Sequence, residues 1–86
     1  MIFVRTESFL NDFRSLPNNI QNKVEKVLRL LANNLRHPSL QIKKMQPKTL
    51  GIFEIRVTLS YRMTCQVEQG RITLRRIGTH NILRTP

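Results

Sequence analysis

The stretch Phe53–Arg75 reads FEIRVTLSYRMTCQVEQGRITLR and alternates apolar with polar residues along most of its length. Apolar side chains fall at every second position in three runs, residues 53–57, 61–68 and 71–75. A period of two is typical of antiparallel strands that bury one face and leave the other in water. Gln69-Gly70 supplies a tight turn between the last two runs. The sequence therefore predicts a meander of three strands.

The residues before this meander have helical spacing instead. Ile2-Phe3-Val4 is a short β-like run, and Thr6 followed by Glu7 is typical of a helix start. Apolar residues then recur at helical spacing over residues 7–16 and 17–35. The expected fold class is α+β, with an N-terminal strand, two helices and an antiparallel meander of three strands. Both helices are expected to pack on one face of the sheet.

Length and composition restrict the class of protein. The 86 residues provide room for a single domain, residues 1–86. No apolar run approaches the roughly 20 residues of a membrane span, and the first residues lack the pattern of a signal peptide. We therefore expect a cytoplasmic protein without membrane contact.

The charge is strongly positive and unevenly distributed. Fifteen Lys and Arg stand against five Asp and Glu, which gives a net charge of +10. Residues 43–86 alone hold nine basic and two acidic side chains. A small domain with this excess usually binds a polyanion or an acidic protein, although a highly charged solvated surface is the alternative.

The turns of the meander predict which side chains meet on its wet face. The two-residue turn places Thr64 opposite Arg75. A three-residue turn between the first two strands places Arg56 opposite Arg62 and Glu54 opposite Thr64. Like charges directly opposite cost stability, whereas a phosphate between them fits the guanidinium donors. The wet face is therefore a candidate phosphate site, and a solvated strand face is the alternative.

A histidine follows the last predicted strand. The register brings His80 to the Arg62 end of the arginine cluster. The unperturbed pKa of histidine lies near neutrality, which suits proton transfer. His80 is therefore a candidate proton carrier, with an ordinary surface histidine as the alternative. His37, which precedes Pro38, is interpreted as a turn residue, and Cys65 as a small core residue.

Five segments, in their order and spacing, are together typical of one protein family. They are Leu16-Pro17, His37-Pro38-Ser39-Leu40, Ile52–Val57, Tyr61-Arg62 and Ile77-Gly78-Thr79-His80. Through them the chain resembles the RelE/ParE superfamily of toxins from toxin–antitoxin pairs over nearly its whole length. The resemblance implies a cognate antitoxin as partner, in a toxin–antitoxin hetero-oligomer. Two actions remain open, because RelE-like members cut mRNA in the ribosomal A site and ParE-like members inhibit DNA gyrase.

The resemblance also implies roles for individual residues. In RelE-like members basic side chains on the sheet face hold the scissile phosphate, and Arg56 and Arg62 match such positions. His80 matches a position where some members carry a catalytic histidine and others an arginine. The chain departs from RelE at Glu54, where RelE has a lysine. It also lacks RelE's tyrosine beyond the last strand, and its Tyr61 points inward in the predicted register.

The favoured hypothesis is a ribosome-dependent mRNA endoribonuclease that inhibits translation. The RNA 2′-hydroxyl would attack the adjacent phosphorus, with positive charge from Arg56, Arg62 and Arg75 on the phosphorane. His80 would move the proton to the leaving oxygen, and Glu54 is a weaker candidate for the base.

Further basic side chains are expected to hold RNA backbone: Lys43, Lys44, Lys48 and Arg76. No cofactor or metal is expected, since the sequence holds no cluster of metal ligands. The alternatives are a ParE-like gyrase inhibitor without nuclease activity and an RNA-binding module without catalysis. The RNA-binding module is disfavoured because Phe3, Phe9, Phe13 and Phe53 are all expected in the core, which leaves no aromatic side chain for base stacking.

Overall fold

The computed structural model describes residues 2–47 and 51–86, so Lys48, predicted to hold RNA, lies outside the described residues. Strands, α-helices (α) and 3-10 helices (η) follow in the order β1 (Ile2–Arg5), α1 (Glu7–Arg14), α2 (Asn18–Asn33), η1 (Pro38–Leu40), β2 (Lys43–Lys44), β3 (Ile52–Arg56), β4 (Tyr61–Glu68), β5 (Arg71–Thr79) and η3 (His80–Arg84). The predicted α+β class, with a strand, two helices and a three-stranded meander, is confirmed. None of the helices described is long and apolar enough to cross a membrane.

The five strands form one mixed sheet in the order β1-β5-β4-β3-β2. The meander β3–β4–β5 is antiparallel, and β1 adds to its edge parallel to β5. Strand β2 was not predicted, because two adjacent lysines carry no alternating pattern. It pairs Lys43 with Glu54 and Lys44 with Phe53, and so extends the sheet beyond β3.

The first helix begins where the sequence predicts, the second begins one residue later, and both end two residues earlier than predicted. The Thr6 hydroxyl accepts the Phe9 N–H at 3.1 Å and so caps α1. Helix α2 follows Pro17 and ends at Asn33, because Asn34 is already extended. Its buried stripe faces the sheet and consists of Ile20, Val24, Leu28 and Leu31.

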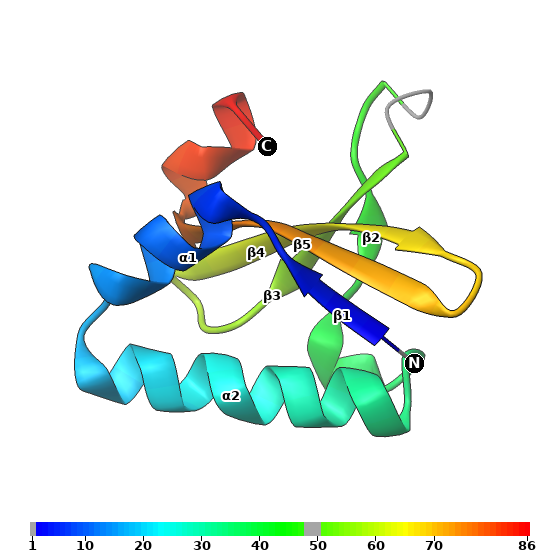
Figure 1. The fold of residues 1–86 in the computed structure, drawn as a ribbon, viewed down its shortest axis with the longest axis horizontal. Coiled ribbons are helices and arrows are strands. Elements are labelled where there is room, and N and C mark those ends of the chain that lie inside the picture. The colour runs from blue at the N-terminus through cyan, green and yellow to red at the C-terminus, as the bar shows by residue number, and fades with distance from the viewer. Residues whose placement is uncertain (1, 48–50) are drawn as a thin grey trace.

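The helices share one core with the inner face of the sheet. Helix α2 crosses this face, and α1 lies beside the part of β5 that continues past β1 (Figure 1). Phe9 of α1 is buried in the same cluster as Val24 of α2 and Ile55 of β3. On β5 the N–H of Ile77 donates to Asp12 Oδ2 at 3.1 Å, so a side chain of α1 replaces the missing strand partner.

A β-bulge interrupts the pairing of β4 with β5. Thr64 pairs with Arg76 and Cys65 with Leu74, which leaves Arg75 as the extra residue. The predicted pairing of Thr64 with Arg75 is therefore wrong, although Arg56 opposite Arg62 and Glu54 opposite Thr64 are confirmed. The bulge changes the alternation after Leu74, so Ile77 also returns to the core.

Residues 80–86 fold back over the outer face of the sheet, opposite α2 (Figure 1). Ile82 is buried here, and a Cβ on Gly78 would lie 2.8 Å from its Cγ2 atom. The Thr64 hydroxyl donates to the Pro86 main-chain oxygen at 3.1 Å. The expectation of a wholly wet outer face is wrong at this place, because the apolar side chain of Ile82 needs a surface on which to pack.

Candidate functional site

The centre of the candidate site is the pair Arg56 and Arg62 on the outer face. They are direct partners on β3 and β4, so their side chains leave the sheet on the same side. The neighbouring pair, Ile55 and Met63, is fully buried on the inner face. The register therefore brings the two arginines together as the sequence predicts.

Arg62 is bound tightly within the chain. Its Nε donates to Glu54 Oε2 at 3.2 Å, and the two side chains are only 20% and 11% exposed. Its Nη1 donates to the main-chain oxygen of Leu59 at 3.0 Å and to those of Thr58 and Tyr61. One side of the guanidinium thus holds the β3–β4 turn, and within the described residues Nη2 has no hydrogen-bond partner.

Arg56 reaches in a different direction. Its Nη1 donates to Gln41 Oε1 at 3.1 Å. Gln41 follows η1 with a φ of 45°, in the left-handed region that non-glycine residues rarely adopt. Arg56 is therefore drawn toward the open edge of β3, away from the Glu54 carboxylate that binds Arg62.

The bulge gives Arg75 and Arg76 structural partners. Arg75 donates from Nε to the Pro86 main-chain oxygen at 3.1 Å and from Nη1 to Gln66 Oε1 at 3.0 Å. Arg76 forms a two-point ion pair with Asp12, at 2.7 and 3.2 Å, and also donates to Thr85. The hydrogen bond to Asp12 raises the pKa of Arg76 above its already high ordinary value. Both arginines thus fasten the C-terminal segment to the sheet.

The two histidines lie in different settings. His80 opens η3 and is exposed, directly after Thr79, which pairs with Tyr61 beside Arg62. This places His80 at the Arg62 end of the sheet. His37 caps η1, because its Nδ1 accepts the Ser39 N–H at 3.2 Å, and its predicted role as a turn residue is confirmed.

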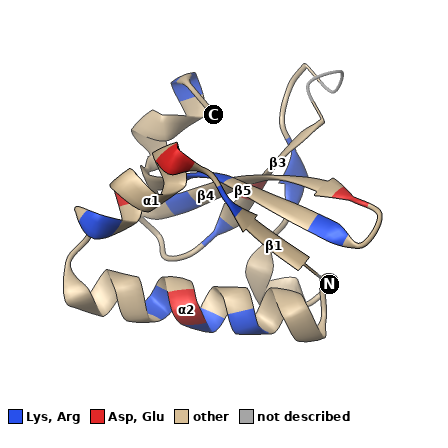
Figure 2. Ribbon diagram, viewed as in Figure 1, with Lys and Arg blue, Asp and Glu red and all other residues tan. Residues whose placement is uncertain are grey.

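The lysines of β2 lie at the far edge of the sheet. Both are exposed, and Lys43 pairs with Glu54 in the register. The Lys44 Nζ lies 5.7 Å from the centre of the Phe53 ring, a cation–π distance. Basic residues also occur on α2 and beyond β5, so the positive charge covers several surfaces (Figure 2).

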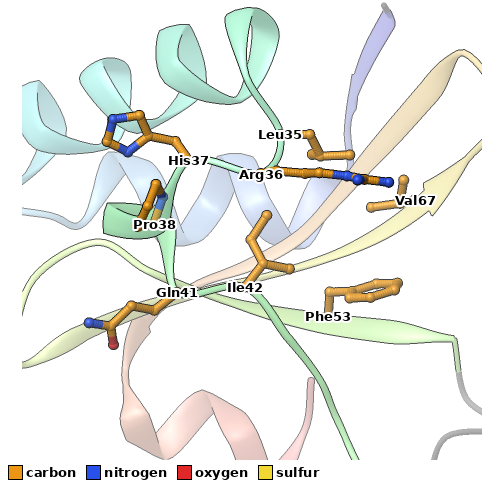
Figure 3. A pocket seen from close by; sticks show the side chains of 8 residues that line it. All are labelled: Leu35, Arg36, His37, Pro38, Gln41, Ile42, Phe53 and Val67. Carbon is orange, nitrogen blue, oxygen red and sulfur yellow. The ribbon is translucent and has the colours of Figure 1, made fainter.

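An apolar pocket that the sequence did not reveal opens between the end of α2 and β3. It has a volume of about 390 Å³, and Figure 3 shows the Arg36 side chain extending across it from Leu35 toward Val67. Phe53 and Ile42 form the opposite wall. Most of its residues lie between Leu35 and Ile42, and it is completed by Phe53 of β3 and Val67 of β4, which no local sequence pattern indicates.

The chemistry that this arrangement offers is the binding of anions and the movement of a proton. The described ranges, 2–47 and 51–86, contain no group of His, Cys, Asp and Glu that could hold a metal ion. Cys65 is fully buried, and burial raises the pKa of its thiol to about 12, so it is a core residue as predicted.

Neither a family model nor a curated protein matches the sequence. Solved structures do match, and over almost the whole chain. YafQ from E. coli superposes with a TM-score of 0.79 at 18% identity, covering 94% of each chain. A YoeB/ParE toxin from Agrobacterium tumefaciens superposes with a TM-score of 0.78 at 16% identity, covering 93% of this chain and 99% of its own.

A third match is a toxin solved together with its antitoxin. The RelB–RelE complex from Methanococcus jannaschii gives a TM-score of 0.74 at 21% identity, covering 95% of each chain. At these identities the likeness concerns the fold. The chain has the fold of the YoeB, YafQ and RelE toxins, and the fold does not separate the branches.

Proposed function

We propose that this chain, with its RelE/ParE toxin fold, is the toxin of a toxin–antitoxin pair and cuts mRNA on the ribosome. The observation that carries this proposal is the pairing of Arg56 with Arg62 on one face, with His80 just beyond the paired end of the sheet. A nuclease that uses the RNA's own 2′-hydroxyl needs positive charge at the phosphorus and a group that moves a proton.

The proposed role as a toxin is supported by the extent of the structural matches as well as by the shared fold. The matched toxins are covered over 94–99% of their own lengths, so the likeness is not limited to a shared sheet. The net charge of +10 suits an acidic antitoxin, which would form a hetero-oligomer with this chain. RelE and YafQ have each been solved in complex with an antitoxin, RelB and DinJ.

Arg62 is proposed as the main phosphate ligand. Its Nε and Nη1 are fixed by Glu54 and by the turn, while Nη2 has no bond to the described residues. A donor that is already held in place stabilises developing charge without reorganising during the reaction. Arg56, on the same face, would add charge to the phosphorane.

His80 is proposed to carry the proton to the leaving oxygen. It is exposed, and the described part of the chain gives its ring no hydrogen bond, so the ring is accessible to RNA. Glu54 is proposed to position Arg62 and not to act as the base, because its carboxylate is buried and carries the Arg62 bond.

The remaining basic residues divide into two groups. Lys43 and Lys44 are proposed to hold RNA backbone at the β2 edge. Lys48, outside the described residues, keeps the same proposed role. Arg75 and Arg76 have internal acceptors, so we propose that they mainly fasten residues 80–86 and contribute long-range charge.

Inhibition of DNA gyrase is the second candidate. The observation that favours it is the engagement of Arg62, Arg75 and Arg76 by the chain's own oxygen atoms, which leaves fewer of their N–H donors for RNA. In that case the surface helices would carry the function, and His80 would be dispensable.

A paired assay separates the two candidates. The purified protein is added to a cell-free translation reaction with intact ribosomes and, separately, to a gyrase supercoiling reaction. Inhibited translation with cleaved mRNA and normal supercoiling supports the nuclease. Blocked supercoiling with intact mRNA supports the gyrase inhibitor and contradicts the proposal.

A further inference from the structure

A basic groove lies between α2 and the open edge of β3. It has a volume of about 240 Å³ and contains three cationic side chains: Lys23, Lys26 and Arg56. Apart from Ser39, the other residues that line it are apolar: Val27, Leu30, Leu40 and Val57. Nothing in the sequence pattern indicated Lys23 and Lys26, because exposed lysines on a helix are usually only a solvated face.

The cations of this groove are not neutralised by the described residues. The three ion pairs found among residues 2–47 and 51–86 involve Arg62, Arg71 and Arg76, and none of them uses a cation of the groove. With 3.6 residues per turn, Lys26 lies about 60° from Lys23 around the axis of α2, whereas Glu25 lies about 160° away. The acidic residue of the helix thus points away from the groove.

The groove is continuous with the outer face through Arg56. Strand β2 pairs only with Phe53 and Glu54, so Arg56 lies where β3 has no further strand beside it in the described sheet. Its hydrogen bond to Gln41 directs the guanidinium toward this edge. The same residue therefore pairs with Arg62 on the outer face and lines the groove on the α2 side.

We infer that this groove binds a phosphate of an RNA strand, one or more nucleotides away from the site of cleavage. The inference rests on the proposed function, since it extends the path of the RNA from Arg62 around the edge of β3 to Lys23 and Lys26. Ammonium groups bind phosphate as compact charges, and the Arg56 guanidinium adds a planar fork of donors. The apolar side chains of the groove can pack against the C–H groups of a ribose.

The experiment measures binding to a single-stranded 2′-O-methyl RNA, which lacks the attacking hydroxyl and stays intact. Fluorescence anisotropy at several salt concentrations gives the slope of log affinity against log salt. For Lys23→Gln/Lys26→Gln we expect a slope smaller by about 0.7, the contribution of one phosphate contact on a single strand. Lys23→Arg/Lys26→Arg keeps the charge and should keep the slope.

The matched control is Arg5→Gln/Arg29→Gln, which removes the same charge at exposed positions that do not line the groove. A smaller change in slope for this control than for the lysine variant supports the site. Equal slopes for the two variants contradict the proposed phosphate site. The site is also contradicted if the lysine variant keeps its RNA affinity and loses only its binding to poly-glutamate, an acidic polypeptide. Circular dichroism and thermal unfolding verify that each variant is folded.

Two further results separate this inference from the proposed function. If the wild type cuts mRNA and the lysine variant binds RNA like the control, the phosphate site in the groove is contradicted and the nuclease proposal is not. A wild-type protein that binds RNA through the lysines without cutting it contradicts the nuclease and leaves the groove supported. Loss of binding only with whole ribosomes, and not with the oligonucleotide, contradicts a site for the cleaved strand, because the lysines then contact ribosomal RNA.

Discussion

Arg56 and Arg62 lie directly opposite each other on β3 and β4, yet their guanidinium groups bind in different directions. Arg62 turns inward to Glu54 and the β3–β4 turn, whereas Arg56 reaches outward to Gln41. One arginine is thus held by several groups of the fold, and the other by a single exposed hydrogen bond. Two residues with the same place in the register should therefore respond differently to mutation.

Arg62→Ala should lower both stability and activity. It removes the partner of the buried Glu54 carboxylate, so we expect a loss of about 2–3 kcal/mol in the free energy of unfolding. Cleavage should fall by roughly a hundredfold or more, the usual scale for one electrostatic contact to a transition state. Arg56→Ala should cost less than about 1 kcal/mol, because its one hydrogen bond is exposed. Urea unfolding of both variants checks this, and equal losses would contradict the assignment.

Asp12 should be more important for stability than its place on a short surface helix suggests. It binds Arg76 at two points and also accepts the Ile77 N–H on β5. Asp12→Ala should lower the free energy of unfolding by about 2–3 kcal/mol, because it leaves the Ile77 N–H without an acceptor. Asp12→Asn keeps an acceptor oxygen and should cost less. Thermal unfolding of the two variants compares them, and equal melting temperatures would argue against the role of the strand N–H.

Gly78 should be required for the docking of the C-terminal segment. Its backbone is extended, so alanine there is not strained, but the new Cβ would lie 2.8 Å from Ile82 Cγ2. Gly78→Ala should destabilise the protein by about 1–3 kcal/mol through overpacking. In the double variant Gly78→Ala/Ile82→Ala the added cost of the alanine at residue 78 should shrink, because the clashing atom is gone. Strict additivity in this double-mutant cycle would show that the two residues do not touch.

Most of the meander follows from the sequence, because alternation and turn residues determine its register. The pairing of Arg56 with Arg62 depends only on a short turn and on keeping apolar residues inside. The bulge at Arg75 was missed, although a signal is present in the sequence. Ile77 is out of phase with Ile72 and Leu74, and all three are buried, so the strand needs an extra residue between them.

The remaining features depend on contacts between distant segments. Asp12 meets Arg76 across 64 positions of sequence, and Arg56 meets Gln41 only after η1 has turned back to the sheet. No local pattern predicts such contacts. The covered outer face has the same origin, since Ile82 lies in a short segment without apolar periodicity.

The stability of the protein at alkaline pH should depend on Cys65. Burial raises the pKa of its thiol from 9.0 to about 12, so the folded state keeps the proton at a pH where the unfolded chain has lost it. The protonated thiol makes its full contribution to the free energy of unfolding below pH 9. As the pH rises from 9 to about 12, this contribution is lost, and the free energy of unfolding falls by a few kcal/mol in total. The stability difference between the wild type and Cys65→Ala should therefore narrow over this range. A stability difference between the two proteins that stays constant with pH would contradict the raised pKa of the thiol.

The same thiol gives a direct check of burial. Cys65 is the single cysteine, so the reaction of the native protein with a disulfide reagent at pH 8 reports this site alone. We expect almost no reaction until denaturant unfolds the chain. Fast reaction of the native protein would show that the core opens readily.

The most direct measurement of the central claim is the mapping of mRNA ends on intact ribosomes with His80→Ala. The control is His37→Ala, which removes the other histidine of the chain. That histidine caps η1. If His80 carries the proton, His80→Ala should reduce the rate of cleavage by about a hundredfold or more while ribosome binding persists. His37→Ala should cut at the same sites as the wild type. Unchanged cleavage by His80→Ala, or no cleavage by the wild type, would contradict the account.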